Sequence, residues 1–233
     1  MPQQPEGNNY NTGLNGVRGI AIILVLLFHY FPEVKIFKIG WTGVDLFFVL
    51  SGFLLTSRIL PFLLEKKLLL KFYWNRALRI LPLYYLFLIL FFLFWFMVID
   101  RKVEQSPFYS HNWYLFFVFF QNWILITTPD NSASHLNHFW SLAVEEQVYL
   151  IYPLFFLLLK KRKNIFLGLV ILLVVIVIAR IITFYYNTGA DNYKSIYCNT
   201  FFRSDSFLLG SLLYFFLNFY QSPVAIKIFK ITS

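Results

Sequence analysis

The first long apolar segment of the chain carries an arginine and a histidine. Arg18 and His29 are eleven residues apart, which in a helix returns both to nearly the same face, roughly 16 Å apart along the axis. Ionisable groups at membrane depth cost free energy, so a chain that keeps them usually uses them. His29 is therefore the first candidate for a functional residue. The competing interpretations are a snorkelling anchor for Arg18 and a hydrogen-bonded packing residue for His29.

Acidic residues stand near the start of two other apolar segments. Asp45 lies between Gly43 and Gly52, and glycines let membrane helices approach closely. We therefore expect Asp45 to be held against a partner such as His29 or an arginine. Helix capping is the alternative, because a carboxylate in the first turn interacts favourably with the helix dipole.

Glu145 and Glu146 form the second acidic group, just after Trp140. Ser141, Glu145 and Tyr149 recur every four residues and share one helical face, whereas Glu146 points about 100° away. Two acids at the start of an otherwise apolar helix are costly unless they are paired or face a wet cavity. Capping is again the alternative, although the spacing from Ser141 is one residue too long for a capping box.

Two arginine-containing pairs complete the set of charged candidates. Arg76 and Arg79 are three residues apart, so they share a helical face and could clamp phosphate groups with their guanidinium forks. Topology signalling and binding of anionic lipid headgroups explain them equally well. Arg203 and Asp205 open the last apolar segment, and an internal structural pair is the more common role for such residues.

Other catalytic arrangements find little support. An acyl-enzyme relay through Ser51 or Ser141 lacks an adjacent base in the sequence, and no nucleophile elbow, phosphate-binding loop or dinucleotide fingerprint occurs. His135 and His138 have no obvious third ligand, so we expect no metal site. Cys198 is the single cysteine. It excludes an intramolecular disulfide, and we interpret it as structural.

The composition identifies the class of protein that must position these residues. Hydrophobic residues make up 59% of the 233 positions, charged residues 13%, and 30 residues are phenylalanine, which is the composition of an integral membrane protein. Only helices and closed barrels satisfy their backbone in lipid, so we predict an all-α, polytopic transmembrane helix bundle. The net charge of +9 comes from short basic loops, which favours positive-inside topology over nucleic-acid binding.

Hydropathy predicts six spanning helices, at 14–31, 43–60, 80–99, 139–159, 164–186 and 201–220. The segment 113–126 is apolar but short, and Gln121 and Asn122 interrupt it. The basic loops after the second and fourth of these helices both face the cytoplasm only if 113–126 does not cross. We therefore predict a re-entrant or interfacial helix there. The same reasoning puts the N-terminus inside, 32–40 and 187–200 outside, and 129–137 near the outer side.

Taken together, the motifs resemble one family. The chain is similar to the acyltransferase-3 family of bacterial multi-pass membrane O-acyltransferases, which modify surface glycans. The resemblance runs in order over residues 14–210 and rests on Arg18-Gly-x-Ala with His29, Gly43-Val-Asp-Leu-Phe-Phe-Val-Leu-Ser-Gly-Phe-Leu54, Arg76-x-x-Arg79-Ile-x-Pro82, Trp140-Ser-Leu-x-Val-Glu-Glu-Gln-x-Tyr149 and, more weakly, Arg203-x-Asp205 with Gly210.

The resemblance implies transfer of an acyl group, commonly acetyl, from acyl-CoA to a hydroxyl of a cell-surface or lipid-linked carbohydrate. His29 is then the general base, and Asp45 or Glu145 orients its imidazole. The residues implied for the CoA phosphates are Arg18, Arg76 and Arg79. Supporting residues are Ser51, Trp140, Ser141, Glu146, Tyr149, Arg203 and Asp205. Acyl-CoA is a donor substrate, and no bound cofactor is implied.

The resemblance also sets expectations for location and completeness. We expect a cytoplasmic tail at 1–13, a partial acyltransferase-3-like membrane domain at 14–220, and at 221–233 a cytoplasmic tail or the start of a missing helix. The location implied is the inner membrane, with lipids as neighbours. The family's domain usually has more helices than this chain offers. The alternatives are therefore an inactive truncated member, an assembly subunit or homo-oligomer, or, outside the family, a proton-coupled transporter.

Overall fold

The chain is all-α, as predicted. The computed structural model describes residues 12–31, 33–62, 66–99, 107–127, 135–186 and 192–219, and within these ranges it contains no strand. The predictions for the two terminal tails and for most of 129–137 lie outside the described residues. The helices are α1 Thr12–Tyr30, α2 Thr42–Ile59, α3 Lys66–Phe94, α4 Pro107–Phe117, α5 Gln121–Thr127, α6 Trp140–Leu159, α7 Arg162–Tyr186, α8 Asn192–Tyr197 and α9 Thr200–Phe219. Short 3₁₀ helices lie at Lys35–Trp41, Leu60–Phe62 and Asn137–Phe139, and a π-helical turn at Trp95–Ile99.

Five of the described helical segments are long and apolar enough to cross a membrane. They are Gly13–Tyr30, Lys35–Ile59, Leu69–Val98, Asn137–Leu159 and Arg162–Tyr186, and each contains or overlaps a predicted span. The sixth predicted span corresponds to α9, which begins at Thr200 and has the length of a span but carries Arg203 and Asp205 in its first two turns. Its charged first turns lower its mean hydropathy, so the count of six spans stays a prediction.

Helix α3 begins fourteen residues before the predicted span. Hydropathy placed its start at residue 80, but the helix starts at Lys66 and continues through Pro82. The added residues are mostly Leu, Lys, Arg and Ala, which favour a helix even where the segment is not continuously apolar. As a result, Arg76 and Arg79 lie about 10 and 15 Å beyond Leu69, inside the apolar stretch rather than at its boundary.

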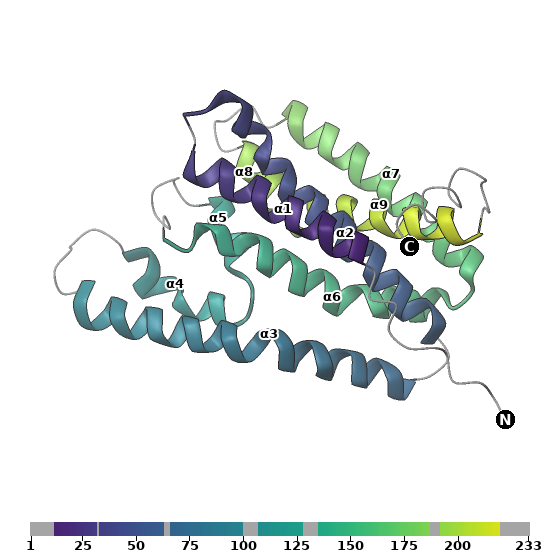
Figure 1. Cartoon of the computed structure of the whole chain (residues 1–233), viewed down its shortest axis with the longest axis horizontal. Helices are drawn as coiled ribbons and strands as arrows, with labels where there is room; N and C mark the ends of the chain where they lie inside the picture. Colours follow the sequence, from purple (N-terminus) through teal and green to yellow (C-terminus); the bar gives the residue numbers. More distant parts are fainter. Residues whose placement is uncertain are drawn as a thin grey trace.

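The long helices run side by side, and their connections collect at two ends of the bundle (Figure 1). α2 and α6 end, and α3 and α7 begin, at the end where α1 starts and α9 finishes; we call this the basic end, after Arg58, Lys160 and Lys161. α1, α5 and α7 end, and α2, α6 and α8 begin, at the other end, which we call the opposite end. The two basic loops therefore lie on one side, as the topology prediction requires.

The segment between α3 and α6 is a broken pair of short helices. α4 has 11 residues and α5 has 7, so they extend about 16 and 10 Å, too short to cross a core of about 30 Å. The chain enters α4 from the opposite end and leaves α5 toward the same end (Figure 1). This arrangement agrees with the prediction that 113–126 does not span.

The break between α4 and α5 exposes backbone carbonyls that lipid cannot satisfy. Phe119 adopts a positive φ of 56° there. Three side chains donate hydrogen bonds to the freed carbonyls: Tyr84 to Phe116 at 2.7 Å, Tyr85 to Phe117 at 3.1 Å, and Gln147 to Phe119 at 2.5 Å. Polar residues on α3 and α6 thus stabilise non-helical backbone inside the bundle.

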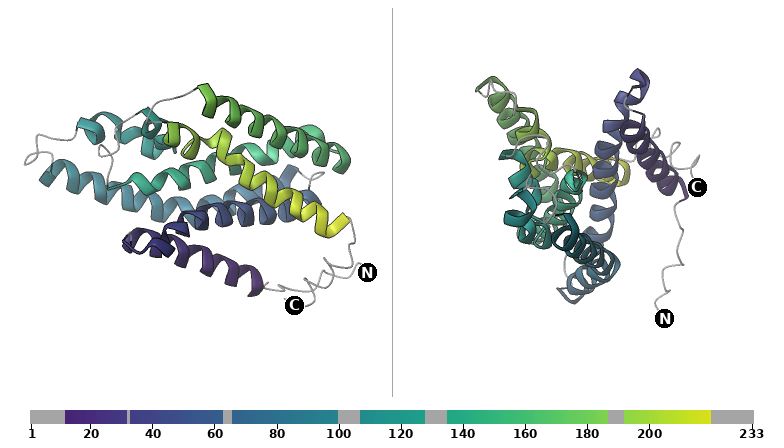
Figure 2. Two further views of the ribbon diagram at one scale, coloured as in Figure 1. Left: turned by 90° about the horizontal axis from the view of Figure 1, so that it is seen from above. Right: turned by 90° about the vertical axis from the view of Figure 1, so that its left-hand side faces the viewer.

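Helix α2 is the centre of the packing. Its Gly52 faces the backbone carbonyl of Phe207 on α9, and Gly210 of α9 faces the carbonyl of Val49, so a Cβ atom at either glycine would clash with backbone. Small residues of this kind allow close helix contact in membranes. On its other side α2 packs against α1, which lies at the edge of the bundle (Figure 2).

Candidate functional site

A cavity of about 730 Å³ lies between α1, α2, α3 and α6. Its apolar walls carry one acid, Glu145, and a set of cations from three helices. The cations are Arg18, Arg58, Lys71, Arg76 and Arg79. The structure therefore brings all three predicted phosphate-binding arginines to one cavity, together with Glu145 and Tyr149.

The wall of this cavity is built around the guanidinium group of Arg76. It contacts Glu146 at 2.7 Å and Glu145 at 3.4 Å, and its Cζ lies 3.1 Å from the centroid of the Tyr149 ring. The Ser51 hydroxyl donates to Glu145 at 3.1 Å. These contacts tie α3, α6 and α2 together at one point.

Arg76 and Arg79 consequently differ, although they share a motif. The guanidinium of Arg76 is only 15% exposed and is shared by two carboxylates. Arg79 is exposed and makes no ion pair with any residue that the structure describes. Arg76 is thus paired with protein carboxylates, whereas Arg79 has no such partner among the described residues.

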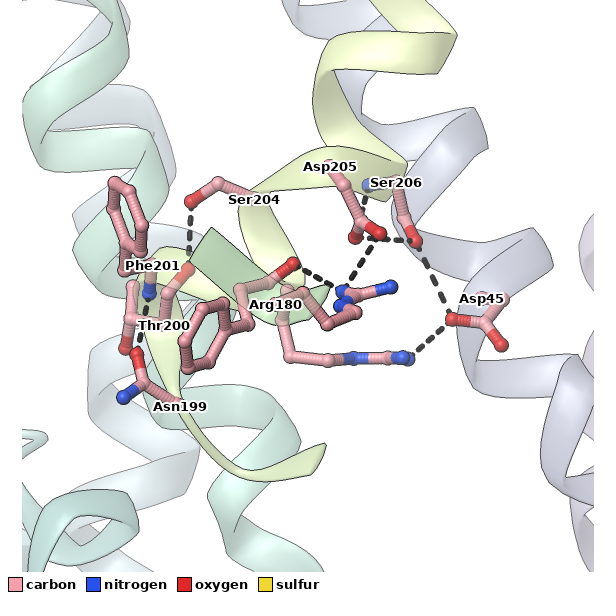
Figure 3. A network of polar contacts seen from close by, with 10 residues as sticks. Asp45, Arg180, Asn199, Thr200, Phe201, Ser204, Asp205 and Ser206 are labelled. Carbon is pink, nitrogen blue, oxygen red and sulfur yellow. Dashed lines mark hydrogen bonds and ion pairs between the residues drawn. The ribbon is translucent and has the colours of Figure 1, made fainter. Parts of the chain in front are cut away.

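A second polar cluster lies at the opposite end (Figure 3). Asp45 of α2 pairs with Arg203 of α9 and accepts a hydrogen bond from Ser206. Arg180 of α7 pairs with Asp205 at 2.7 Å. Asp45 is therefore held by an arginine, one of the two partners expected for it.

Arg203 and Asp205 pair with different helices rather than with each other. Residues two positions apart on a helix point in nearly opposite directions, so the expected internal pair does not form. Arg203 is buried, and its guanidinium lies near three aromatic rings, 4.9 Å from Tyr197, 5.4 Å from Phe48 and 5.7 Å from Trp140. The cluster joins α2, α7 and α9. Trp140 is buried beside it.

His29 lies away from both clusters. Its Nδ1 is 2.8 Å from the carbonyl of Val25. Because a carbonyl only accepts, Nδ1 carries the hydrogen, and the neutral ring has its lone pair on Nε2. The side chain is exposed. The imidazole therefore presents a basic nitrogen away from its own helix.

The packing of α1 on α2 sets the distance between His29 and the acids. Gly40 faces Leu24 and Phe28, and Gly43 faces Ala21, Leu24 and Val25, so the two helices are antiparallel and Gly43 is level with about residue 23. In that register Asp45 is level with residue 21 of α1, about 12 Å along the axis from His29, and Ser51 with its partner Glu145 is farther still, about 20 Å. The structure thus does not bring Asp45 or Glu145 to the imidazole.

Several residues of the site were missed or read differently in the sequence. Arg58 and Lys71 belong to the basic segment after the second predicted span, which we used only as a topology signal, but both line the cavity. The side-chain amide nitrogen of Gln147, which donates to the Phe119 carbonyl, also donates to the side-chain oxygen of Asn122 at 2.9 Å. Ser141 donates to the carbonyl of His138 at 3.1 Å, which is a local contact. The only signal in the sequence for these contacts was the presence of Asn122 and Gln147 within apolar segments.

Cys198 takes no part in either cluster. The thiol is buried next to α9, and this burial raises its pKa to about 12. A thiol with that pKa is protonated at neutral pH and a poor nucleophile. The structural interpretation of Cys198 agrees with this environment.

Comparison with known proteins places the chain in a family. The acyltransferase-3 family model, described as an acyltransferase domain, matches residues 11–231. The O-acetyltransferase OatA of Staphylococcus aureus is 32% identical over 221 residues, covering 88% of this chain and 34% of that protein. The peptidoglycan O-acetyltransferase OatA of Listeria monocytogenes is 34% identical over 157 residues, covering 64% of this chain and 24% of that protein. No solved structure matches the chain.

The chain thus spans about a quarter to a third of the length of these relatives. The family match nevertheless covers α1 to α9 and includes every residue of the cavity and of the cluster around Arg203. With its helical membrane fold and this match, the chain belongs to the acyltransferase-3 family of membrane acyltransferases.

Proposed function

We propose that the chain is a membrane O-acyltransferase that moves an acetyl group from acetyl-CoA to a sugar hydroxyl of the cell envelope. The observation that carries the proposal is the convergence of five cations and Glu145 on one cavity. Phosphate groups are the ligands that guanidinium and ammonium groups favour. The names of the relatives support an acetyl group and, for one of them, peptidoglycan as the acceptor.

The orientation in the membrane follows from the basic end. We propose that the chain lies in the inner membrane of the cell. Because positive residues prefer the cytoplasm, the basic end and the N-terminus would then face the cytoplasm. Acetyl-CoA then enters the cavity from the side on which it is made. His29 lies toward the opposite end, where the sugar is modified.

In the reaction proposed, the Nε2 lone pair of His29 takes the proton from the attacking sugar hydroxyl. The oxygen adds to the acyl carbonyl, the carbon–sulfur bond breaks, and the CoA thiolate leaves and takes up a proton. The phosphates would remain near Arg18, which is roughly 16 Å from His29 along one face of α1. The flexible arm of the donor would cover that distance.

The test measures ester formation by the full chain in membranes. Labelled acetyl-CoA and cell-wall glycan are supplied, and alkali-labile acetyl ester is counted for wild type, His29→Gln and His135→Gln. Loss of a general base lowers the rate by about 10² to 10⁴, so His29→Gln should lose nearly all ester formation. His135→Gln is the matched control, because His135 is an exposed histidine outside the cavity.

Two results would count against the proposal. Ester formation that survives His29→Gln would refute the general-base assignment. If the wild-type chain forms no ester from any acyl-CoA, the inactive or partner-dependent reading is favoured instead.

A further inference from the structure

The cations of the cavity lie at two levels along the bundle. Lys71 and Arg79 are eight residues apart on α3, about 12 Å along its axis. Glu145 connects Arg76 of α3 with Ser51 of α2 and so aligns these two helices. In that alignment Arg58 of α2 falls near the level of Lys71.

The α1–α2 packing places the remaining cation. Gly43 lies among Ala21, Leu24 and Val25, so it is level with about residue 23, and the antiparallel register puts Arg18 opposite about residue 48 of α2. The alignment through Arg76 puts Arg79 at the same level. The cations of the cavity therefore form two pairs. We call Arg58 with Lys71 the outer pair, because it lies nearer the basic end, and Arg18 with Arg79 the inner pair, because it lies farther from that end.

None of these four cations forms an ion pair with a residue in the part of the chain that the structure describes. Arg76, which lies between the two levels, is neutralised by Glu145 and Glu146. Arg58 and Lys71 are exposed where the cavity reaches the basic end. Positive-inside topology accounts for cations in the loops, but it does not require two of them to line the same cavity from different helices.

We propose that the outer pair, Arg58 and Lys71, binds the 3′-phosphate of coenzyme A and makes the site selective for donors that carry it, while the inner pair binds the diphosphate. This inference rests on the proposed function and deepens it. Two separate phosphate positions in the ligand match two separate cation pairs in the cavity. The inner pair leaves the length of α1 from Arg18 to His29 for the arm that carries the thioester.

The experiment compares acetyl-CoA with acetyl-dephospho-CoA, which differs only in lacking the 3′-phosphate. For the wild-type chain we expect KM to be roughly tenfold lower for acetyl-CoA, as for the loss of one charged hydrogen-bonding partner. In Arg58→Gln/Lys71→Gln the KM for acetyl-CoA should rise to the value for the dephospho donor. The KM for the dephospho donor should not change.

Two further variants control for charge and folding. Lys160→Gln/Lys161→Gln removes the same charge at the basic end but away from the cavity lining, and it should keep the full preference for acetyl-CoA. Arg58→Lys/Lys71→Arg preserves the charge and should keep most of that preference. A loss of preference in the Lys160/Lys161 variant, or an equal rise of KM for both donors in the Arg58/Lys71 variant, would overturn the inference.

Equilibrium binding of CoA and dephospho-CoA to the purified chain separates this inference from the proposed function. Preferential binding of CoA that depends on Arg58 and Lys71, without ester formation, would support the inference and count against the function. Ester formation with equal use of both donors would support the function and overturn the inference.

Discussion

Replacing Arg76 by methionine should destabilise the bundle far more than the same change at Arg79. Arg76 is 15% exposed and is shared by Glu146, at 2.7 Å, and Glu145, at 3.4 Å. Methionine fills similar space but leaves both carboxylates without their cation. Removing one partner of a buried ion pair typically costs about 3 to 5 kcal/mol.

The measurement is thermal unfolding in detergent, followed as loss of the monodisperse protein peak. For a chain of this size about 3 kcal/mol corresponds to a fall in Tm of roughly 6 to 12 °C. Arg79→Met is the matched control, since Arg79 lies on the same helix and has no ion-pair partner among the described residues. Its Tm should fall by less than about 2 °C, because exposed charges contribute little.

A third variant tests the cause. Glu146→Gln in the Arg76→Met background removes one of the two uncompensated carboxylates, so it should recover part of the lost stability. An equal fall in Tm for Arg76→Met and Arg79→Met, or no recovery in the double variant, would refute the argument.

Three other predictions follow from the packing and the buried groups. Gly52→Ala would press its Cβ against the Phe207 carbonyl and should cost about 1 to 3 kcal/mol, whereas Gly16→Ala, with nothing within 4 Å, should leave Tm unchanged; equal Tm values would contradict the close α2–α9 packing. Gln147→Leu removes the donor to the Phe119 carbonyl and should cost about 1 to 3 kcal/mol and speed hydrogen exchange between α4 and α5, and unchanged exchange would argue against this role. Burial raises the pKa of Cys198 to about 12, so the thiolate is scarce at neutral pH and maleimide labelling should keep rising with pH up to 10 without a plateau; a plateau near pH 9 would show an ordinary, accessible thiol.

Hydropathy and charge predicted most of the fold, because a membrane-spanning helix is specified by local composition. The helical class, the five apolar spans and the common side of the two basic loops all follow from stretches of about 20 residues. The span predicted at 80–99 starts eleven residues after Leu69, where the apolar stretch of α3 begins, since helix propensity matters there more than hydropathy.

The sequence by itself determined which residues are costly in free energy to bury in this bundle. These are the ionisable groups among apolar neighbours: His29, Asp45, Arg76, Glu145 and Arg203. Only the tertiary structure decided their partners. Arg76 of α3 pairs with Glu146 of α6, seventy residues later in the chain, and Arg203 of α9 pairs with Asp45 of the neighbouring helix α2. The physical reason is that the cost of a buried charge depends on its own local surroundings, whereas its compensation depends on which helix faces are brought together.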